Sequence, residues 1–180
     1  MKRLLYITLA FSILTFTACE ESDLSINFDL TKGDIAFTLT ADQVINSNGQ
    51  PIEVSTPAQS TLTGDMADYA DQLDKVESAK LKTLKVSIVS PAEQKFSFVD
   101  EVKFYITGKD IDEVLVGSKS DIDASASVVE LDINDLNLVE YIKSGEVSTR
   151  VSVTTSEGID NDCDMIADMT YQITAAVLNK

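Results

Sequence analysis

The chain of 180 residues contains no histidine and no tryptophan. Without histidine, catalysis by a Ser-His-Asp triad or a Cys-His pair is excluded, and so is an imidazole-bound metal. Tryptophan offers the largest aromatic face for stacking on a sugar ring. Its absence weakens a carbohydrate-binding interpretation, although tyrosine and phenylalanine remain. These absences favour a protein that is not an enzyme and needs no cofactor.

Charged side chains are almost absent from the first 18 residues, where only Lys2 and Arg3 carry a charge. They precede an uncharged, mostly apolar run, LLYITLAFSILTFTA. A short basic segment followed by such a run is typical of a secretory signal peptide. The run is too short for a comfortable transmembrane helix, which needs about 20 apolar residues. We therefore expect residues 1–18 to form a signal helix that is removed from the mature protein.

The end of this run resembles the lipobox of bacterial lipoproteins, in which a small residue precedes a cysteine. Here Phe16, Thr17 and Ala18 precede Cys19, and Phe16 stands where that family prefers leucine or another aliphatic residue. The resemblance implies that a diacylglycerol is attached to the thiol of Cys19, that the signal is cut before it, and that the new amino group is acylated. Two or more acyl chains anchor a protein firmly, whereas one does not. An ordinary secreted protein or an uncleaved anchor is the alternative.

The segment EESD (residues 20–23) directly follows Cys19. It resembles the export signal that sends lipoproteins of bacteroidete-type bacteria to the outer face of the outer membrane, and the alternative is a solvated tether. We therefore predict an outer-membrane lipoprotein that faces the cell exterior, with the periplasmic face as the alternative. Its parts are the signal peptide (1–18), the lipidated cysteine with its acidic tether (19–23) and a single β-sandwich domain (24–180).

Basic residues are few, with 14 lysines and arginines against 30 acidic residues. Loss of Lys2 and Arg3 with the signal would leave 12 basic residues among 162 and a net charge of −18. Such a negative surface disfavours nucleic acid and anionic lipid headgroups as partners. It keeps the protein soluble and could also hold cations. Arg150 would be the only arginine of the mature chain, so an arginine clamp on phosphate is not expected.

From Leu24 onward the hydrophobic period is mostly two, which is typical of half-buried strands. The runs LSINFDL (24–30) and IAFTLTA (35–41) flank Gly33 and predict a β-hairpin. Asn48-Gly49 predicts a turn. Further strands are expected at residues 52–55, 60–63, 84–89, 95–108, 113–118, 127–133, 146–155 and 165–178, with a bulge or corner where the alternation slips at Asp100-Glu101.

Two segments have a helical pattern instead. DMADYADQLDKV (65–76) has apolar residues at helical spacing behind Asp65, a suitable N-cap. NDLNLVEYIKSG (134–145) has Asp135 as a candidate N-cap and Gly145 just past the expected C-terminal end. About ten strands at hairpin spacing, without a βαβ rhythm, predict an all-β fold. We expect an antiparallel immunoglobulin-like β-sandwich with two short helices, preceded by the signal helix. The pattern resembles that of β-sandwich surface lipoproteins of bacteroidete-type bacteria.

The best candidate for chemistry is DNDCDMIAD, which places aspartates at alternating positions, namely Asp160, Asp162 and Asp164. This is the one-three-five spacing of a calcium loop, and Asp168 stands at position nine. However, Met165 occupies the position that needs glycine, and Tyr171 the position of the bidentate glutamate. The segment is therefore expected to be an acidic turn that binds calcium weakly or not at all, and no metal site is predicted.

The remaining candidate features are the thiol of Cys163 and a second acidic segment. Cys163 stands among the carboxylates of that segment, which should raise the pKa of its thiol and make it a poor nucleophile. The segment KDIDE (109–113) predicts a second acidic turn, in a hairpin loop after Gly108.

These observations predict a non-catalytic, lipid-anchored cell-envelope protein that acts as a surface interaction or structural module. Its partners would be the membrane, through the lipid on Cys19, and a surface protein or glycan that the sequence does not identify. The alternative is a small accessory protein that binds a glycan or a divalent cation at the cell surface.

Overall fold

The computed structural model describes residues 25–60 and 73–176 of the chain. These residues form nine strands, two short α-helices and two short 3₁₀ helices, at residues 73–75 and at Phe96–Phe98. In chain order the strands and α-helices are β1 (Ser25–Leu39), α1 (Ala41–Asn46), β2 (Ile52–Ser60), β3 (Val76–Ser90), β4 (Val99–Gly108), β5 (Ile111–Lys119), β6 (Val128–Glu130), β7 (Asp132–Ile133), α2 (Val139–Lys143), β8 (Glu146–Thr155) and β9 (Cys163–Ala176).

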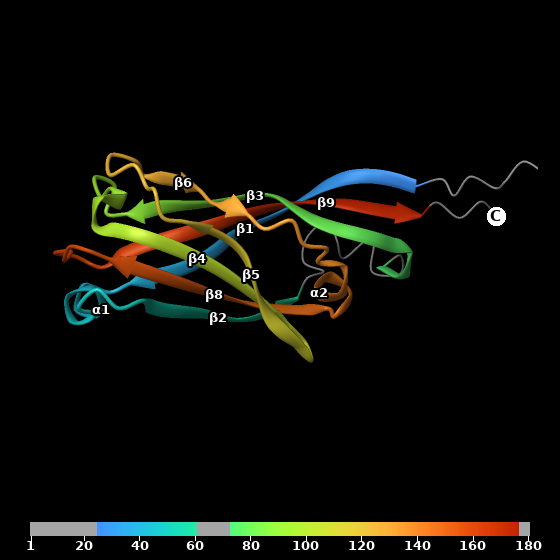
Figure 1. Cartoon of the computed structure of the whole chain (residues 1–180), viewed down its shortest axis with the longest axis horizontal. Helices are drawn as coiled ribbons and strands as arrows, with labels where there is room; N and C mark the ends of the chain where they lie inside the picture. Colours follow the sequence, from blue (N-terminus) through green and yellow to red (C-terminus); the bar gives the residue numbers. More distant parts are fainter. Residues whose placement is uncertain (1–24, 61–72, 177–180) are drawn as a thin grey trace, which may run out of the picture.

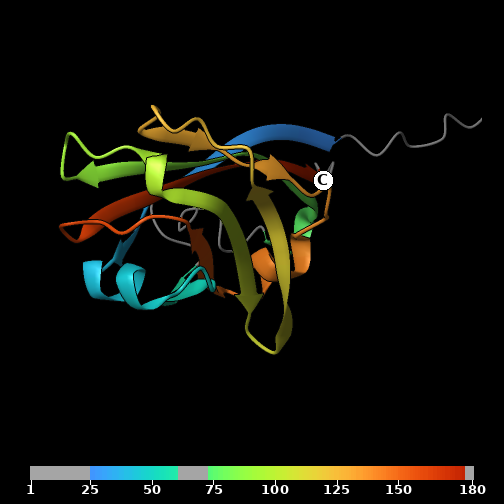
Figure 2. The same cartoon turned by 60° about the vertical axis from the view of Figure 1, so that its left-hand side comes forward.

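Two antiparallel sheets form the layers of a sandwich (Figures 1 and 2). One sheet has four strands in the order β1-β9-β3-β6, and the other has five in the order β2-β8-β4-β5-β7. The predicted all-β antiparallel sandwich is therefore confirmed. Its immunoglobulin-like character stays a prediction, and the signal helix and residues 19–24 lie outside the described residues.

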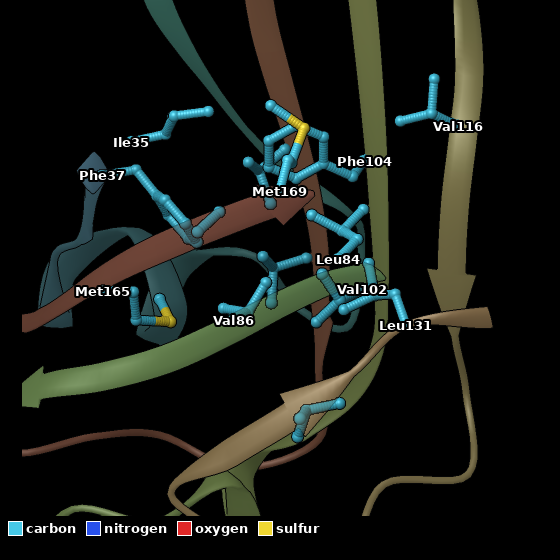
Figure 3. Packing of buried hydrophobic residues seen from close by; sticks show 14 of the residues in the cluster. Ile35, Phe37, Leu84, Val86, Val102, Phe104, Val116, Leu131, Met165 and Met169 are labelled. Carbon is cyan, nitrogen blue, oxygen red and sulfur yellow. The ribbon is translucent and has the colours of Figure 1, made fainter. Parts of the chain in front are cut away.

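The space between the sheets is filled by alternate residues along the strands, whose side chains face inward (Figure 3). On β9 every second residue from Cys163 to Ile173 is buried, so the clearest strand predicted from the sequence is confirmed. The facing sheet contributes Phe104 from β4 and Val151 from β8, both fully buried. Each buried side chain of this size stabilises the fold by about 1.5–3 kcal/mol relative to an exposed one, so the pattern of period two holds the two layers together.

The predicted hairpin around Gly33 is wrong, because residues 25–39 form the single strand β1. Its pairing with β9 shifts register between Lys32 and Ile35, which is a bulge. Asp34 sits there with φ of 60°, and its backbone N–H donates to a carboxylate oxygen of Asp168 at 3.2 Å. A Cβ on Gly33 would lie 2.8 Å from the same oxygen, so a larger residue there would require the Asp168 carboxylate to shift. The bulge shifts the inward positions by one, which explains why the apolar residues change from even to odd numbers.

The helices differ from those expected. The strand predicted at residues 35–41 ends at Leu39, and α1 follows it after a capping box formed by Thr40 and Gln43. The helix predicted at residues 65–76 lies mostly outside the described residues, while 73–75 form a 3₁₀ turn and Val76 already begins β3.

The second predicted helix exists but is shorter. It is α2, and Asp135 does not cap it, because the helix begins at Val139 with Leu138 in the N-cap position. Asp135 forms an exposed ion pair with Lys80. Instead, the side-chain oxygen of Asn137 accepts from the backbone N–H groups of Val139 and Ala79. Gly145 follows the helix with φ of 79°, as its predicted position requires.

Two expectations for the strands are modified. The slip at Asp100 is confirmed as a register shift between Val99 and Glu101, although the residues just before it form the 3₁₀ helix rather than a strand. The strand predicted at 127–133 is divided, since β6 pairs with β3 in one sheet and β7 pairs with β5 in the other. Leu131, between them, is buried, so the chain crosses from one layer to the other around this anchored residue.

Candidate functional site

Cys19, the predicted lipidation site, and the acidic tether lie outside the described residues, so lipidation stays a prediction. No helix in the described ranges 25–60 and 73–176 is long and apolar enough to cross a membrane. The described part of the chain starts with β1 at Ser25, six positions after Cys19. Six extended residues span at most about 20 Å. A lipid on Cys19 would therefore keep the end of the sandwich where β1 begins close to a membrane.

Strand β1 carries the chain from this end to the opposite one (Figure 1). Its 15 residues extend about 45 Å at the usual rise of a strand. One residue after β1, the helix α1 begins at Ala41. The helix thus lies at the end of the long axis that is remote from Ser25.

A shallow pocket of about 540 Å³ opens beside α1. Three separate segments line it: α1 with the turn that follows it, the bulge at the start of β4, and the end of β8 with the loop after it. Its volume lies in the range of about 300–1,000 Å³ that is usual for small-ligand sites. It is the candidate binding site of this structure, and we call it the α1 pocket.

Local backbone geometry positions the walls of the α1 pocket. Asn48 and Gly49 have φ of 52° and 76°, so the Asn-Gly turn predicted from the sequence is confirmed and forms one wall. Asp100 is the extra residue of the bulge in β4, and bulges commonly redirect a side chain next to a binding site. The backbone N–H of Ser156 donates to the carbonyl of Phe98 at 3.1 Å, which holds the loop after β8 against the start of β4.

The lining of the α1 pocket combines apolar, hydroxyl and acidic groups. Val44 is buried at its base, and Ile45 is 61% exposed, although an isoleucine is usually covered. Two carboxylates, Asp100 and Glu157, face solvent and have no hydrogen-bond or ion-pair partner among the described residues. No lysine or arginine is among the residues that line the pocket. The pocket therefore has unneutralised negative charge next to an exposed aliphatic surface.

The aspartates of the predicted acidic loop lie next to this end of the molecule but do not converge. Asp162 accepts a hydrogen bond from the backbone N–H of Ala41 at 2.9 Å. Asp164, already on β9, accepts one from the hydroxyl of Thr38 at 2.7 Å. Asp160 is exposed. Within the described part of the chain, no three acidic or cysteine side chains are grouped so that they could hold a metal ion.

A second polar cluster, which the sequence analysis missed, lies on the outer face of the five-stranded sheet. Arg150 on β8 donates from Nε and Nη2 to the two carboxylate oxygens of Glu113 on β5, at 2.8 and 2.6 Å. Its Nη1 donates to Glu53 on β2, and Ser152 donates to the same carboxylate at 2.7 Å. The guanidinium carbon lies 3.9 Å from the ring centroid of Tyr105 on β4.

The charges of this cluster satisfy one another. The hydrogen bonds that Arg150 donates to Glu113 raise the pKa of the guanidinium further, and the guanidinium in turn holds the pKa of Glu113 below its ordinary value of 4.5. Because the planar face of Arg150 is covered by Tyr105 and its edge is used by two carboxylates, little of it remains for a ligand. We interpret the cluster as a brace across four adjacent strands. No sequence pattern pointed to it, because it depends on the order of strands in the sheet.

Cys163 and the turn at residues 109–113 also have defined places. Cys163 is completely buried at the start of β9, and burial, with a smaller effect from Asp164, raises the pKa of its thiol to about 11. The direction agrees with the prediction, but the main cause is burial rather than the neighbouring carboxylates. Residues 109 and 110 form the turn of the β4–β5 hairpin as predicted, with Asp110 at φ of 58°.

Comparison with known proteins identifies a fold and no family. No model of a protein family matches the sequence, and no curated protein sequence matches it. Among solved structures, a protein from Eubacterium rectale that is described as secreted has a TM-score of 0.52 at 17% sequence identity. The match covers 86% of this chain and 41% of that one, so this chain spans less than half the length of its structural neighbour.

Viral proteins also align with the sandwich, at lower similarity. A decameric capsid protein of BFDV has a TM-score of 0.43 at 7% identity, and the match covers 84% of this chain and 99% of that one. A chain of Desmodium yellow mottle tymovirus has a TM-score of 0.34 at 10% identity, with coverage of 100% and 97%. At such identities and TM-scores these likenesses carry no information about function.

Proposed function

We propose that the protein is a non-catalytic, lipid-anchored protein of the cell envelope whose β-sandwich acts as an interaction module. The observation that carries this proposal is the position of β1. The strand begins six residues after the lipobox cysteine, and it ends next to α1, at the opposite end of the sandwich. A lipid on Cys19 would hold the end at Ser25 near the membrane and present the α1 pocket away from it.

The proposed location within the envelope rests on the segment EESD after Cys19, which resembles an export signal. The acidic residues after Cys19 support an outer-membrane location with the domain facing the cell exterior, and the periplasmic face is the alternative. The immunoglobulin-like description of the sandwich belongs to this proposal too. Such sandwiches gather loops at their two ends and often use the loops of one end for binding.

The alternative is an accessory protein that binds a glycan or a divalent cation at the cell surface, and it has less support. No aromatic side chain is among the residues that line the α1 pocket, so a sugar ring would have nothing to stack on there. Asp162 and Asp164, the best candidates for cation ligands, are hydrogen-bonded to Ala41 and Thr38.

The anchor is tested by replacing each of the two cysteines in turn. Cells that express the full chain are grown with an alkyne-labelled fatty acid and then fractionated. We expect the wild type and Cys163→Ala to carry the label and to sediment with membranes. Cys19→Ser should lose the label, and it should keep its signal or appear in soluble fractions. Equal labelling of Cys19→Ser and the wild type would contradict the anchor.

The orientation is tested separately, on the lipidated protein in vesicles. A donor fluorophore is placed on Ser25→Cys or on Gln50→Cys, two exposed positions at opposite ends of the sandwich. Cys163 is buried and should not react. With acceptor-labelled lipids, energy transfer should be much stronger from position 25 than from position 50. Equal transfer from both positions would mean that the sandwich lies flat on the membrane.

A further inference from the structure

The α1 pocket has three properties that together define what it can bind. It has an aliphatic wall, made by Val44 and by the exposed side chain of Ile45. It has two carboxylates without a partner among the described residues, Asp100 and Glu157. It also has the buried hydroxyl of Thr155, which lies 3.4 Å from that of Ser47. An apolar wall, acceptors and negative charge in one pocket fit an amphipathic cation.

The charge around the pocket has the same sign. The loops at this end are linked by hydrogen bonds: Ala41 to Asp162, Ser156 to Phe98, and Phe96 to Ala126. These loops, at residues 40–51, 90–100, 120–127 and 155–162, carry eight acidic residues against the single lysine Lys95; the acidic ones are Asp42, Glu93, Asp100, Asp121, Asp123, Glu157, Asp160 and Asp162. A field of one sign over a concave surface attracts ligands of the opposite charge and speeds their association.

We propose that the α1 pocket binds a lysine or arginine side chain presented by a partner protein. The aliphatic stem of that side chain lies along Val44 and Ile45, and its cationic head is held by the carboxylates of Asp100 and Glu157. Hydroxyl groups of the lining accept the remaining donors. The inference rests on the proposed function, because an anchor at Cys19 would turn this end away from the membrane and toward other proteins.

Other ligands fit the pocket less well. A calcium ion needs six to eight oxygen ligands, and it would leave the exposed face of Ile45 unused. An anionic ligand would meet two carboxylates and no basic group in the lining. A free polyamine shares the cationic chemistry of a lysine side chain, so the experiment must separate the two sources.

The test measures binding of a fluorescent peptide to the full lipidated protein in neutral detergent micelles, by fluorescence anisotropy. The probe is a flexible Gly-Ser peptide with three lysines, and its control has glutamine in place of each lysine. Asp100→Asn, Glu157→Gln and Ile45→Ser remove the proposed contacts one at a time. Asp121→Asn is the matched control, because it removes one negative charge from the same end of the molecule but not from the pocket.

We expect the lysine peptide to bind, the glutamine peptide not to bind, and the affinity to fall with added salt. Each pocket variant should weaken binding by about threefold to tenfold, as expected for loss of one contact to a charged group. Asp121→Asn should stay within about twofold of the wild type. Ile45→Ser separates this pocket from general attraction to an acidic surface, because it removes apolar area and no charge.

Several results would overturn the proposal. Equal weakening by Asp121→Asn and Asp100→Asn would show general electrostatic attraction without a site. If Ile45→Ser binds the lysine peptide as tightly as the wild type, the aliphatic wall does not contact the side chain and the proposed binding mode is wrong. Spermidine that binds and depends on Asp100 while the peptide does not would assign the pocket to a free polyamine. Because these measurements use purified protein and the fractionation uses cells, loss of peptide binding together with normal labelling at Cys19 would overturn the pocket and leave the anchor intact.

Discussion

The guanidinium of Arg150 stacks on the ring of Tyr105, its directly paired neighbour on the adjacent strand, with 3.9 Å from Cζ to the ring centroid. Glu53 and Glu113 reach the same guanidinium from strands on the two sides. The only arginine beyond the first three residues thus lies at the centre of a four-strand contact. Stacking and bidentate hydrogen bonding both depend on the planar shape of the group, which lysine does not have.

Arg150→Lys should therefore destabilise the fold although the charge is kept. We expect a loss of about 1–2 kcal/mol in the free energy of unfolding, because the stacking contact and at least one charge-assisted hydrogen bond disappear. Urea denaturation of the domain measures this loss. The control is Lys80→Met, which breaks the exposed pair with Asp135 and should cost less than about 0.5 kcal/mol. Equal effects of the two substitutions would mean that the cluster is no brace.

The same cluster predicts how stability changes in acid. The pKa of Glu113 is held below its ordinary value of 4.5, chiefly by the hydrogen bonds from Arg150. A carboxyl group whose pKa is lowered by folding stabilises the fold above its unfolded pKa, and this contribution is lost as the pH falls through the folded pKa. We expect the free energy of unfolding to fall as the pH drops below about 4.5, with a shallower fall in Glu113→Gln.

Arg150→Met provides the matching control for the acid effect, because it removes the cause of the shift and keeps Glu113. Its stability should depend on acid in the same shallower way as that of Glu113→Gln. Urea midpoints at pH 3, 4, 5 and 7 give the comparison. If the urea midpoints of both variants fall as steeply with decreasing pH as that of the wild type, the acid sensitivity arises from other carboxylates.

Cys163 should not react in the folded protein. The thiolate is the reactive form, and burial raises the pKa of this thiol to about 11 while it also shields the sulfur completely. With a disulfide reagent at pH 8, we expect no labelling of the native protein and rapid labelling of one thiol in guanidinium, when Cys19 is lipidated or replaced by serine. Fast labelling of the native protein would show that the start of β9 opens readily.

The features that the sequence predicted correctly are local. An alternation of apolar residues that includes Met165, Met169 and Ile173 marks β9. Asn48-Gly49 and Gly145 mark places where the backbone has positive φ. Such signals act within a few residues and do not depend on what packs against them. The capping box of Thr40 and Gln43 is also a local signal, but the strand pattern directly before the short helix α1 obscures it.

The features that could not be predicted depend on contacts between distant segments. Gly33 suggested a turn, but Asp168 on β9 takes up the backbone N–H of Asp34 and makes the site a bulge in a continuous strand. The α1 pocket is lined by three segments between Val44 and Gly158, and Arg150 finds its partners on three other strands. Strand order and register decide these contacts, and one sequence does not determine them.

Calcium should stabilise the protein little, if at all. Asp164 and Asp168 both project from the outer face of β9, and four residues of strand separate them by about 13 Å. Asp162, Asp164 and Asp168 are each already hydrogen-bonded to a different group, on Ala41, Thr38 and Asp34. To bind one ion, these carboxylates would have to leave these contacts and converge from positions too far apart. A ligand at 100 times its Kd adds about 2.7 kcal/mol, and we expect a far smaller effect at millimolar calcium. Thermal unfolding with calcium and with chelator measures it, and a shift of many degrees that Asp162→Asn abolishes would contradict this prediction.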